Sequence, residues 1–114
     1  MSDERRRDKR WDVCLDAVWN SRGGTSSARV TDLSEGGCYI DCLNQPHVGD
    51  ILYLRLQLSN GDSLELTGEV AHQTPPLGFG LRFVELTEEQ LNKLNALIDH
   101  LKRTRDSVSA IMSY

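Results

Sequence analysis

The segment ILYLRLQLSNGDSLELTGEVAH, residues 51–72, has the most regular pattern of the 114-residue chain. Apolar residues alternate with polar ones on both sides of SNGD, which is typical of two strands that each bury one face. Asn60-Gly61 favours a tight hairpin turn, because both central positions of that turn need positive φ. The segment therefore predicts an antiparallel hairpin whose inner faces carry Leu52, Leu54, Leu56 and Leu58 on one strand and Leu64, Leu66, Gly68 and Val70 on the other.

Shorter stretches of the same kind lie on both sides of this hairpin. They are separated by clusters of turn-forming residues and have the sequences WDVCLDAVW (11–19), ARVTDL (28–33), CYID (38–41) and FGLRFVEL (79–86). Antiparallel strands joined by tight turns usually close into a barrel or a sandwich, which removes exposed edges. We therefore expect a mainly β fold in which residues 11–86 form a six-stranded antiparallel β-barrel.

After residue 86 the spacing of apolar residues changes to that of a helix. Thr87 followed by Gln90 is the pattern of a capping box. The apolar residues that follow at helical spacing are Leu91, Leu94, Leu97, Ile98 and Leu101. These features predict a C-terminal α-helix over residues 87–105 that packs on an opening or flank of the barrel. Residues 106–114 are expected to extend this helix or to form a tail, within a single domain spanning 1–114.

The composition is that of an ordinary globular protein, with 39% hydrophobic and 26% charged residues. No apolar run approaches the roughly 18 residues that cross a bilayer, and the stretch after the basic N-terminus is interrupted by aspartates, unlike a signal peptide. We therefore expect a cytoplasmic protein without membrane insertion. The cysteines, Cys14, Cys38 and Cys42, are odd in number and form no Cys-x-x-Cys pair, so neither a disulfide framework nor a metal site is predicted.

Positive charge is concentrated at the N-terminus, in the sequence ERRRDKRW of residues 4–11. Residues 1–10 carry five basic and three acidic side chains, a net of +2, whereas the whole chain has a net charge of −4 and the remainder therefore −6. An acidic body repels a long polyanion, so nucleic acid is not the expected partner. A basic arm, expected to be flexible, fits a small anion better.

No arrangement in the sequence indicates catalysis. The three histidines, His47, His72 and His100, stand near no serine or cysteine in a recognisable nucleophile setting. The sequence also lacks a Walker-type glycine loop, and GFG at 78–80 opens a strand and not a helix. We therefore expect a protein that is not an enzyme.

The arm and the sequence DLSEGG, residues 32–37, together have the chemistry of a nucleotide site. Arginine presents a planar fork that matches phosphate oxygens and the O6 and N7 edge of guanine. An aspartate complements the N–H donors on the other edge of guanine. A serine hydroxyl and glycine amides can approach a phosphate or a base closely. Either feature alone is usually a solvated tail or a turn.

The sequence RRDKR, Arg6 to Arg10, followed by DLSEGG resembles the Arg-x-x-x-Arg and Asp/Asn-x-Ser-x-x-Gly motifs of PilZ domains. The resemblance extends from residue 4 to residue 101 and includes LTGEVAH and PLGFGLRFVEL. It implies a six-stranded split barrel with a C-terminal helix that binds the bacterial second messenger cyclic di-GMP, with no further cofactor. The ligand-binding residues that it implies are Arg5, Arg6, Arg10, Asp32, Ser34 and Gly37, and His72 lies near a position where some members place a stacking aromatic residue.

The resemblance implies a receptor that relays a signal. We expect the arm to become ordered over the ligand and so to change the surface offered to a downstream effector protein, such as motility, secretion or exopolysaccharide machinery. One or two ligand molecules fit this expectation, and a monomer is the default state. Two alternatives stay open: a protein–protein adaptor on a PilZ-like barrel that does not sense nucleotide, and a nucleic-acid binder that uses the arm as a phosphate clamp.

Overall fold

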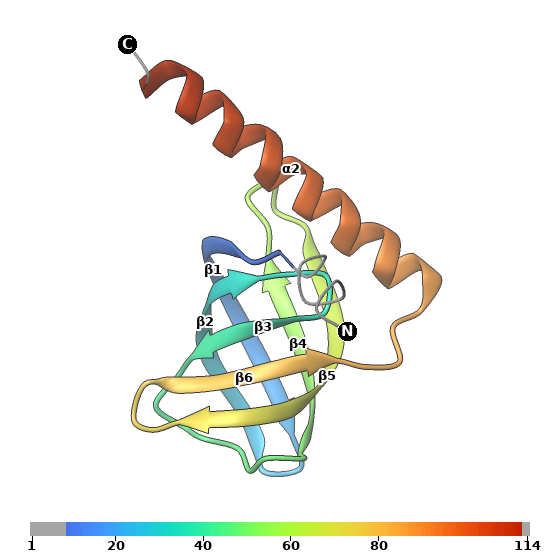
Figure 1. The fold of residues 1–114 in the computed structure, drawn as a ribbon. Helices are drawn as coiled ribbons and strands as arrows, with labels where there is room; N and C mark the ends of the chain where they lie inside the picture. Colours follow the sequence, from blue (N-terminus) through green and yellow to red (C-terminus); the bar gives the residue numbers. More distant parts are fainter. Residues whose placement is uncertain (1–8, 113–114) are drawn as a thin grey trace, which may run out of the picture.

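The structure is a computed structural model that describes the chain over residues 9–112, with side chains over 9–104. It is a closed antiparallel barrel with strand order β1-β2-β3-β6-β5-β4, followed by one helix (Figure 1). This confirms the predicted fold. The elements are β1 Trp11–Ser21, β2 Gly24–Leu33, β3 Gly37–Asp41, β4 Ile51–Gln57, β5 Ser63–Thr74, β6 Gly78–Phe83 and α2 Glu88–Met112.

Strands β4 and β5 form the hairpin expected from residues 51–72. Their register runs from Ile51 opposite Glu69 to Gln57 opposite Ser63, and the alternating leucines of both strands are buried. The turn differs from the prediction, because only Gly61 has positive φ (90°) among its residues. The Gly61 amide donates to the Leu58 carbonyl at 3.1 Å, and the Leu58 amide donates to the Asp62 carbonyl at 2.9 Å, so the connection is wider than a two-residue turn.

The core fills the inside of the barrel with side chains from all six strands and from the helix. Trp19 of β1 meets Phe79 of β6 edge to face, with ring centroids 5.7 Å apart. Leu94 of α2 is fully buried in the same cluster. The helix therefore covers one end of the barrel, and Figure 1 shows its C-terminal part extending beyond the strands.

Helix α2 begins with the capping box that the sequence indicated. The Thr87 amide donates to Gln90 Oε1 at 2.8 Å, and the Gln90 amide donates to Thr87 Oγ1 at 3.1 Å. The Gln90 amide group also donates to the Glu65 carbonyl of β5 at 3.0 Å, which ties the helix start to the barrel. The helix continues to Met112, so residues 106–112 extend it, which is one of the two outcomes expected for this segment. Within the described part of the chain, no helix is both long and apolar enough to cross a membrane.

Candidate functional site

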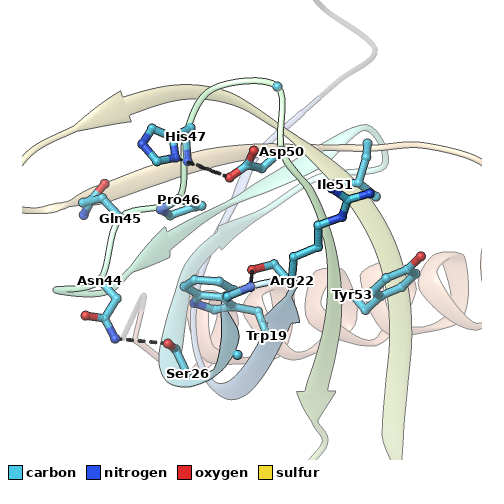
Figure 2. A pocket seen from close by; sticks show the side chains of 14 residues that line it. Trp19, Arg22, Ser26, Asn44, Gln45, Pro46, His47, Asp50, Ile51 and Tyr53 are labelled. Carbon is cyan, nitrogen blue, oxygen red and sulfur yellow. Dashed lines mark hydrogen bonds and ion pairs between the residues drawn. The ribbon is translucent and has the colours of Figure 1, made fainter.

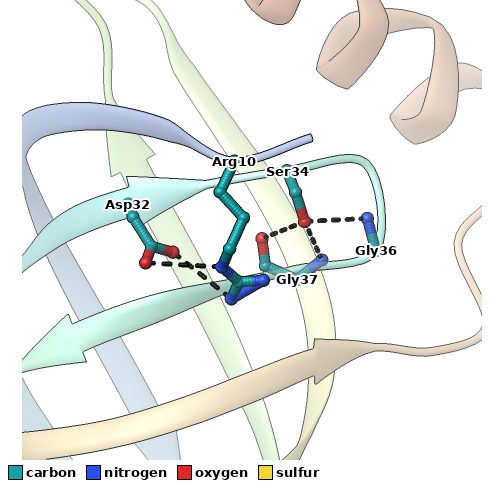
Figure 3. Close-up of polar contacts among 5 residues, drawn as sticks. All are labelled: Arg10, Asp32, Ser34, Gly36 and Gly37. Carbon is teal, nitrogen blue, oxygen red and sulfur yellow. Dashed lines mark hydrogen bonds and ion pairs between the residues drawn. The ribbon is translucent and has the colours of Figure 1, made fainter. Parts of the chain in front are cut away.

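The turn between β2 and β3 is organised by the buried hydroxyl of Ser34 (Figure 3). This hydroxyl lies 3.2 Å from the amides of Gly36 and Gly37, from which it accepts, and 3.2 Å from the Gly37 carbonyl, to which it donates. The Ser34 amide donates to the same carbonyl at 2.8 Å. A side chain that satisfies several backbone groups of one turn fixes the turn's conformation. Ser34 is therefore a structural residue of the site, buried completely beneath the turn that it holds.

Gly37 is required at the start of β3 because the neighbouring strand approaches too closely for a side chain. A Cβ atom at this position would lie 2.3 Å from the carbonyl oxygen of Leu81 on β6. Gly36 is held from the same side, since its carbonyl accepts from the Phe83 amide at 2.9 Å. The turn is thus bound tightly to β6.

Arg10 and Asp32 form an ion pair beside this turn. Arg10 Nε lies 3.4 Å from Asp32 Oδ2, and Arg10 Nη2 lies 3.3 Å from Asp32 Oδ1 (Figure 3). The side chains are 46% and 29% exposed, so the pair is accessible from solvent. Exposed pairs at such distances contribute little stability. A ligand can therefore replace either side chain as the partner of the other at a small cost in free energy.

The position of Asp32 depends on an irregularity in β2. The pairing of β2 with β3 shifts between Val30 and Asp32, so that Val30 points into the core and Asp32 does not. A bulge of this kind moves a side chain from one face of a sheet to the other. Leu33 is then buried, and Asp32 faces the outside of the barrel.

Three further residues share the outer face with Asp32 in a row across the sheet. Asp32 of β2 pairs with Tyr39 of β3, Tyr39 pairs with Gly80 of β6, and Gly80 pairs with His72 of β5. The His72 ring lies over Gly80, where a Cβ atom would come within 2.2 Å of it. Its centroid is 6.3 Å from that of Tyr39, with the ring planes inclined by 31°. The row joins a carboxylate to two aromatic rings.

The sequence did not identify Tyr39 and Gly80 as site residues, and it left the placement of His72 open. Alternation in CYID was the available signal, because it puts Tyr39 on the face opposite the buried Cys38. Which residues of β6 and β5 join this row depends on the register of β6 with β3 and of β5 with β6. A second register shift, between Val70 and His72 in the pairing of β5 with β6, places His72 outside.

Cys38 lies directly beneath this surface as a neutral thiol. Burial raises the pKa of Cys38 far above its ordinary value, and the nearby Asp32 carboxylate raises it further, against a smaller opposing effect of Arg10. A thiol held protonated is neither a nucleophile nor a metal ligand. Cys38 therefore contributes packing to the site.

The structure brings together four of the six residues predicted for the site: Arg10, Asp32, Ser34 and Gly37. Arg5 and Arg6 lie outside the described residues. Within the described part of the chain, no group of three or more His, Cys, Asp or Glu side chains is placed to hold a metal ion. A guanidinium, a carboxylate and two flat rings on one surface suit a planar heterocycle that carries anionic groups.

Comparison with known structures shows the same fold in several proteins. The PilZ domain of YcgR from Escherichia coli, solved with c-di-GMP, has a TM-score of 0.77 at 14% identity, over 93% of this chain and 98% of that one. The PilZ domain of CeSA from a cellulose-synthesizing bacterium has a TM-score of 0.67 at 17% identity, over 82% and 98%.

The inhibitor of motility MotI/DgrA from Bacillus subtilis has a TM-score of 0.72 at 17% identity, over 89% of this chain, and the chain spans 51% of that protein's length. A sequence comparison with curated proteins finds no match. The sequence profile of the PilZ domain, however, matches residues 4–100, which is most of the chain. The barrel, the two motifs and this match lead to one conclusion: the chain belongs to the PilZ domain family.

Proposed function

We propose that this protein is a non-enzymatic receptor for cyclic di-GMP in the bacterial cytoplasm. The ligand would bind on the outer face of the barrel, over β2, β3, β6 and β5. The observation that carries the proposal is the exposed pair of Arg10 and Asp32 beside the rigid Ser34 turn. Family membership and the fold shared with a c-di-GMP-bound PilZ domain support it.

Arg10 and Asp32 have complementary tasks in this proposal. The guanidinium of Arg10 matches a phosphate or the O6 and N7 atoms of guanine, and the carboxylate of Asp32 accepts from N1–H and N2–H₂ on guanine's other edge. Without ligand each group neutralises the other at 3.3 Å. Binding replaces this loose pair with charge-assisted hydrogen bonds to the nucleotide.

The aromatic row would supply a stacking surface next to this pair. Tyr39 and His72 present rings on the same face as Asp32, and Gly80 leaves the space that the His72 ring occupies. A purine base stacks on such rings because both surfaces are flat and polarisable. In the proposal His72 moves from Gly80 onto the base, and Tyr39 lines the middle of the site.

Arg5 and Arg6 complete the proposed site from the arm. Two further guanidinium groups would neutralise the phosphates of one ligand molecule or of a stacked pair. Their engagement would order residues 1–10 over the ligand, and the reshaped surface would then be offered to an effector protein. This step links ligand binding to the signal.

Isothermal titration calorimetry against cyclic di-GMP tests the proposal, with GMP and cyclic di-AMP as comparison ligands. We expect heat from cyclic di-GMP with an affinity in the micromolar range or tighter, and a loss of about 10- to 150-fold in Arg10→Ala, which removes a charge-assisted contact. Arg29→Ala is the matched control, because Arg29 is also an exposed arginine paired with an aspartate, Asp16, but lies outside the site. Absence of heat from every nucleotide would support the adaptor alternative instead.

A further inference from the structure

A concave surface lies at the end of the barrel opposite α2. It is a pocket of about 830 Å³ between the β1–β2 hairpin, the loop of residues 42–50 and the start of β4. Its floor is Trp19, and Pro46, Ile51 and Tyr53 add apolar surface (Figure 2). None of the residues in the proposed nucleotide site lines it. Ser26 at this pocket and Asp32 lie six positions apart along β2, about 20 Å of strand.

Hydrogen bonds hold the walls of this pocket in place. Asn44 Nδ2 donates to Ser26 Oγ at 3.1 Å, which ties the loop to the hairpin. Asp50 is paired through its backbone with Val70 of β5 and accepts the His47 amide on Oδ2 at 2.9 Å. Gln73 of β5 also donates to the Pro46 carbonyl. The pocket is therefore preformed, as binding sites usually are.

Two buried polar atoms of the pocket lining have no partner among the described residues. Trp19 is 5% exposed, and its Nε1–H finds no acceptor. Gln45 donates through Nε2 to the Cys42 carbonyl at 2.8 Å, which leaves its buried Oε1 without a donor. These atoms are unsatisfied polar groups of the lining, which folded proteins rarely leave without a partner.

Exposed apolar side chains collect around the same pocket. Of the six large apolar residues exposed in the described part of the chain, Ile51 and Tyr53 line the pocket, Leu43 and Val48 lie in its 42–50 loop, and Leu77 lies in the neighbouring β5–β6 hairpin. Leu77 comes from the β5–β6 hairpin, which reaches the loop through a hydrogen bond from the Cys42 amide to the Leu77 carbonyl at 3.4 Å. Leu43 is 88% exposed and Tyr53 60%. A concentration of apolar surface at one place is characteristic of protein-binding sites.

Arg22 is the positive charge of this surface without a counterion. Its side chain extends from the β1–β2 hairpin over the pocket toward β4 (Figure 2). Elsewhere on the barrel Arg29, Arg55 and Arg82 are each paired with an acidic residue, whereas Arg22 pairs with none of the described residues. Asp50, the acidic residue of the pocket, is already bonded to His47. The free charge therefore favours a carboxylate.

We propose that this pocket docks an extended segment of a partner protein that carries a large apolar or aromatic side chain next to an aspartate or glutamate. The apolar side chain would occupy the space above Trp19 between Pro46 and Tyr53. The carboxylate would pair with Arg22. That this partner is the effector of the nucleotide signal rests on the proposed function, whereas the docking itself does not.

Random 12-residue peptides displayed on phage, selected on the immobilised protein without nucleotide, are the probe for this proposal. We expect enrichment of an apolar or aromatic residue adjacent to Asp or Glu. In ¹⁵N-labelled protein a selected peptide should shift the indole N–H signal of Trp19 and leave that of Trp11, next to the arm, unchanged. Arg22→Gln should weaken binding about 10-fold or more, as expected for a lost charge-assisted hydrogen bond, and Arg29→Gln should not.

Several results would overturn the docking proposal. They are a selection that enriches no sequence, a selection that enriches basic peptides, binding that survives Arg22→Gln, and a peptide that moves Trp11 and not Trp19. Self-association of the protein abolished by Tyr53→Ala would assign the surface to a second copy and overturn it as well. Failure of nucleotide binding leaves these results unaffected, because the selection contains no nucleotide.

Discussion

At the scale of single residues, the candidate site depends on contacts that allow little variation. Ser34 satisfies two backbone amides with one hydroxyl, and Gly37 leaves room for a carbonyl of the adjacent strand. Both residues belong to the Asp-x-Ser-x-x-Gly motif, yet their structural contribution is to the shape of the turn. Asp32 and Arg10 are the residues of this group whose side chains are partly exposed.

Gly37→Ala should destabilise the fold. The added Cβ would lie 2.3 Å from the Leu81 carbonyl oxygen, so β3 and β6 must separate locally. We expect a loss of about 1–3 kcal/mol in the free energy of unfolding, measured by urea denaturation. Gly23→Ala, where the nearest atom would be 3.9 Å away, is the control and should change the free energy little. Equal stability of the two variants would refute the close approach.

The stability of the protein should fall at alkaline pH through Cys38. Its pKa is raised in the folded state, so the folded protein retains a proton that the unfolded chain loses as the pH rises above 9.0. The contribution of this thiol to the free energy of unfolding is therefore constant at neutral pH. Above pH 9.0 the free energy of unfolding declines by about 1.4 kcal/mol per pH unit. Urea unfolding from pH 8 to 11 should give a steeper decline in the wild type than in Cys38→Ala. Cys14→Ala, at an exposed cysteine, should retain the wild-type slope.

At the scale of elements, alternation and spacing predicted most of the strands and the helix start, because each depends on nearby residues. The capping box of Thr87 and Gln90 is such a local feature. The turn at Asn60-Gly61 was predicted less well, since the dipeptide is compatible with several loop lengths. The bulges before Asp32 and His72 could not be predicted, because a register shift follows from pairing with strands distant in the sequence.

Thr87→Ala should weaken the attachment of α2 to the barrel. The substitution removes the hydroxyl that accepts the Gln90 amide, and an N-cap of this kind contributes about 1 kcal/mol. Thermal unfolding followed by circular dichroism should show the loss, while Thr87→Ser should restore most of it because the hydroxyl returns. A Thr87→Ser variant as unstable as Thr87→Ala would show that the methyl group, and not the cap, matters.

At the scale of the whole molecule, the barrel separates two chemically different surfaces. The nucleotide site proposed on β2, β3, β6 and β5 carries an exposed ion pair and an aromatic row, and the opposite end carries a pocket with an unpaired arginine. The sequence motifs predicted the polar half of the first surface. They could not predict the aromatic row or the pocket, since each is assembled from separate segments that closure of the barrel brings together.

The aromatic row should contribute to ligand affinity without supporting the fold. His72 is exposed and covers Gly80, so His72→Ala removes a ring but no buried contact. We expect cyclic di-GMP to bind about 5- to 150-fold more weakly, in line with about 1–3 kcal/mol for base stacking on an aromatic side chain, with an unchanged unfolding midpoint. His100→Ala, at an exposed histidine of α2, is the control. Unchanged affinity in His72→Ala would remove His72 from the proposed site.

The most direct test of the central claim is a map of the cyclic di-GMP contact surface on ¹⁵N-labelled protein by nuclear magnetic resonance. We predict that backbone amide signals of Arg10, residues 32–37, Tyr39, Gly80 and His72 shift as the nucleotide is added, while those of Arg22 and Tyr53 at the opposite end stay in place. The same titration on Arg10→Ala should need about 10- to 150-fold more nucleotide to reach equal shifts. Signals that move only around Arg22 and Tyr53, or that do not move at all, would contradict the assignment of this face as a receptor for cyclic di-GMP.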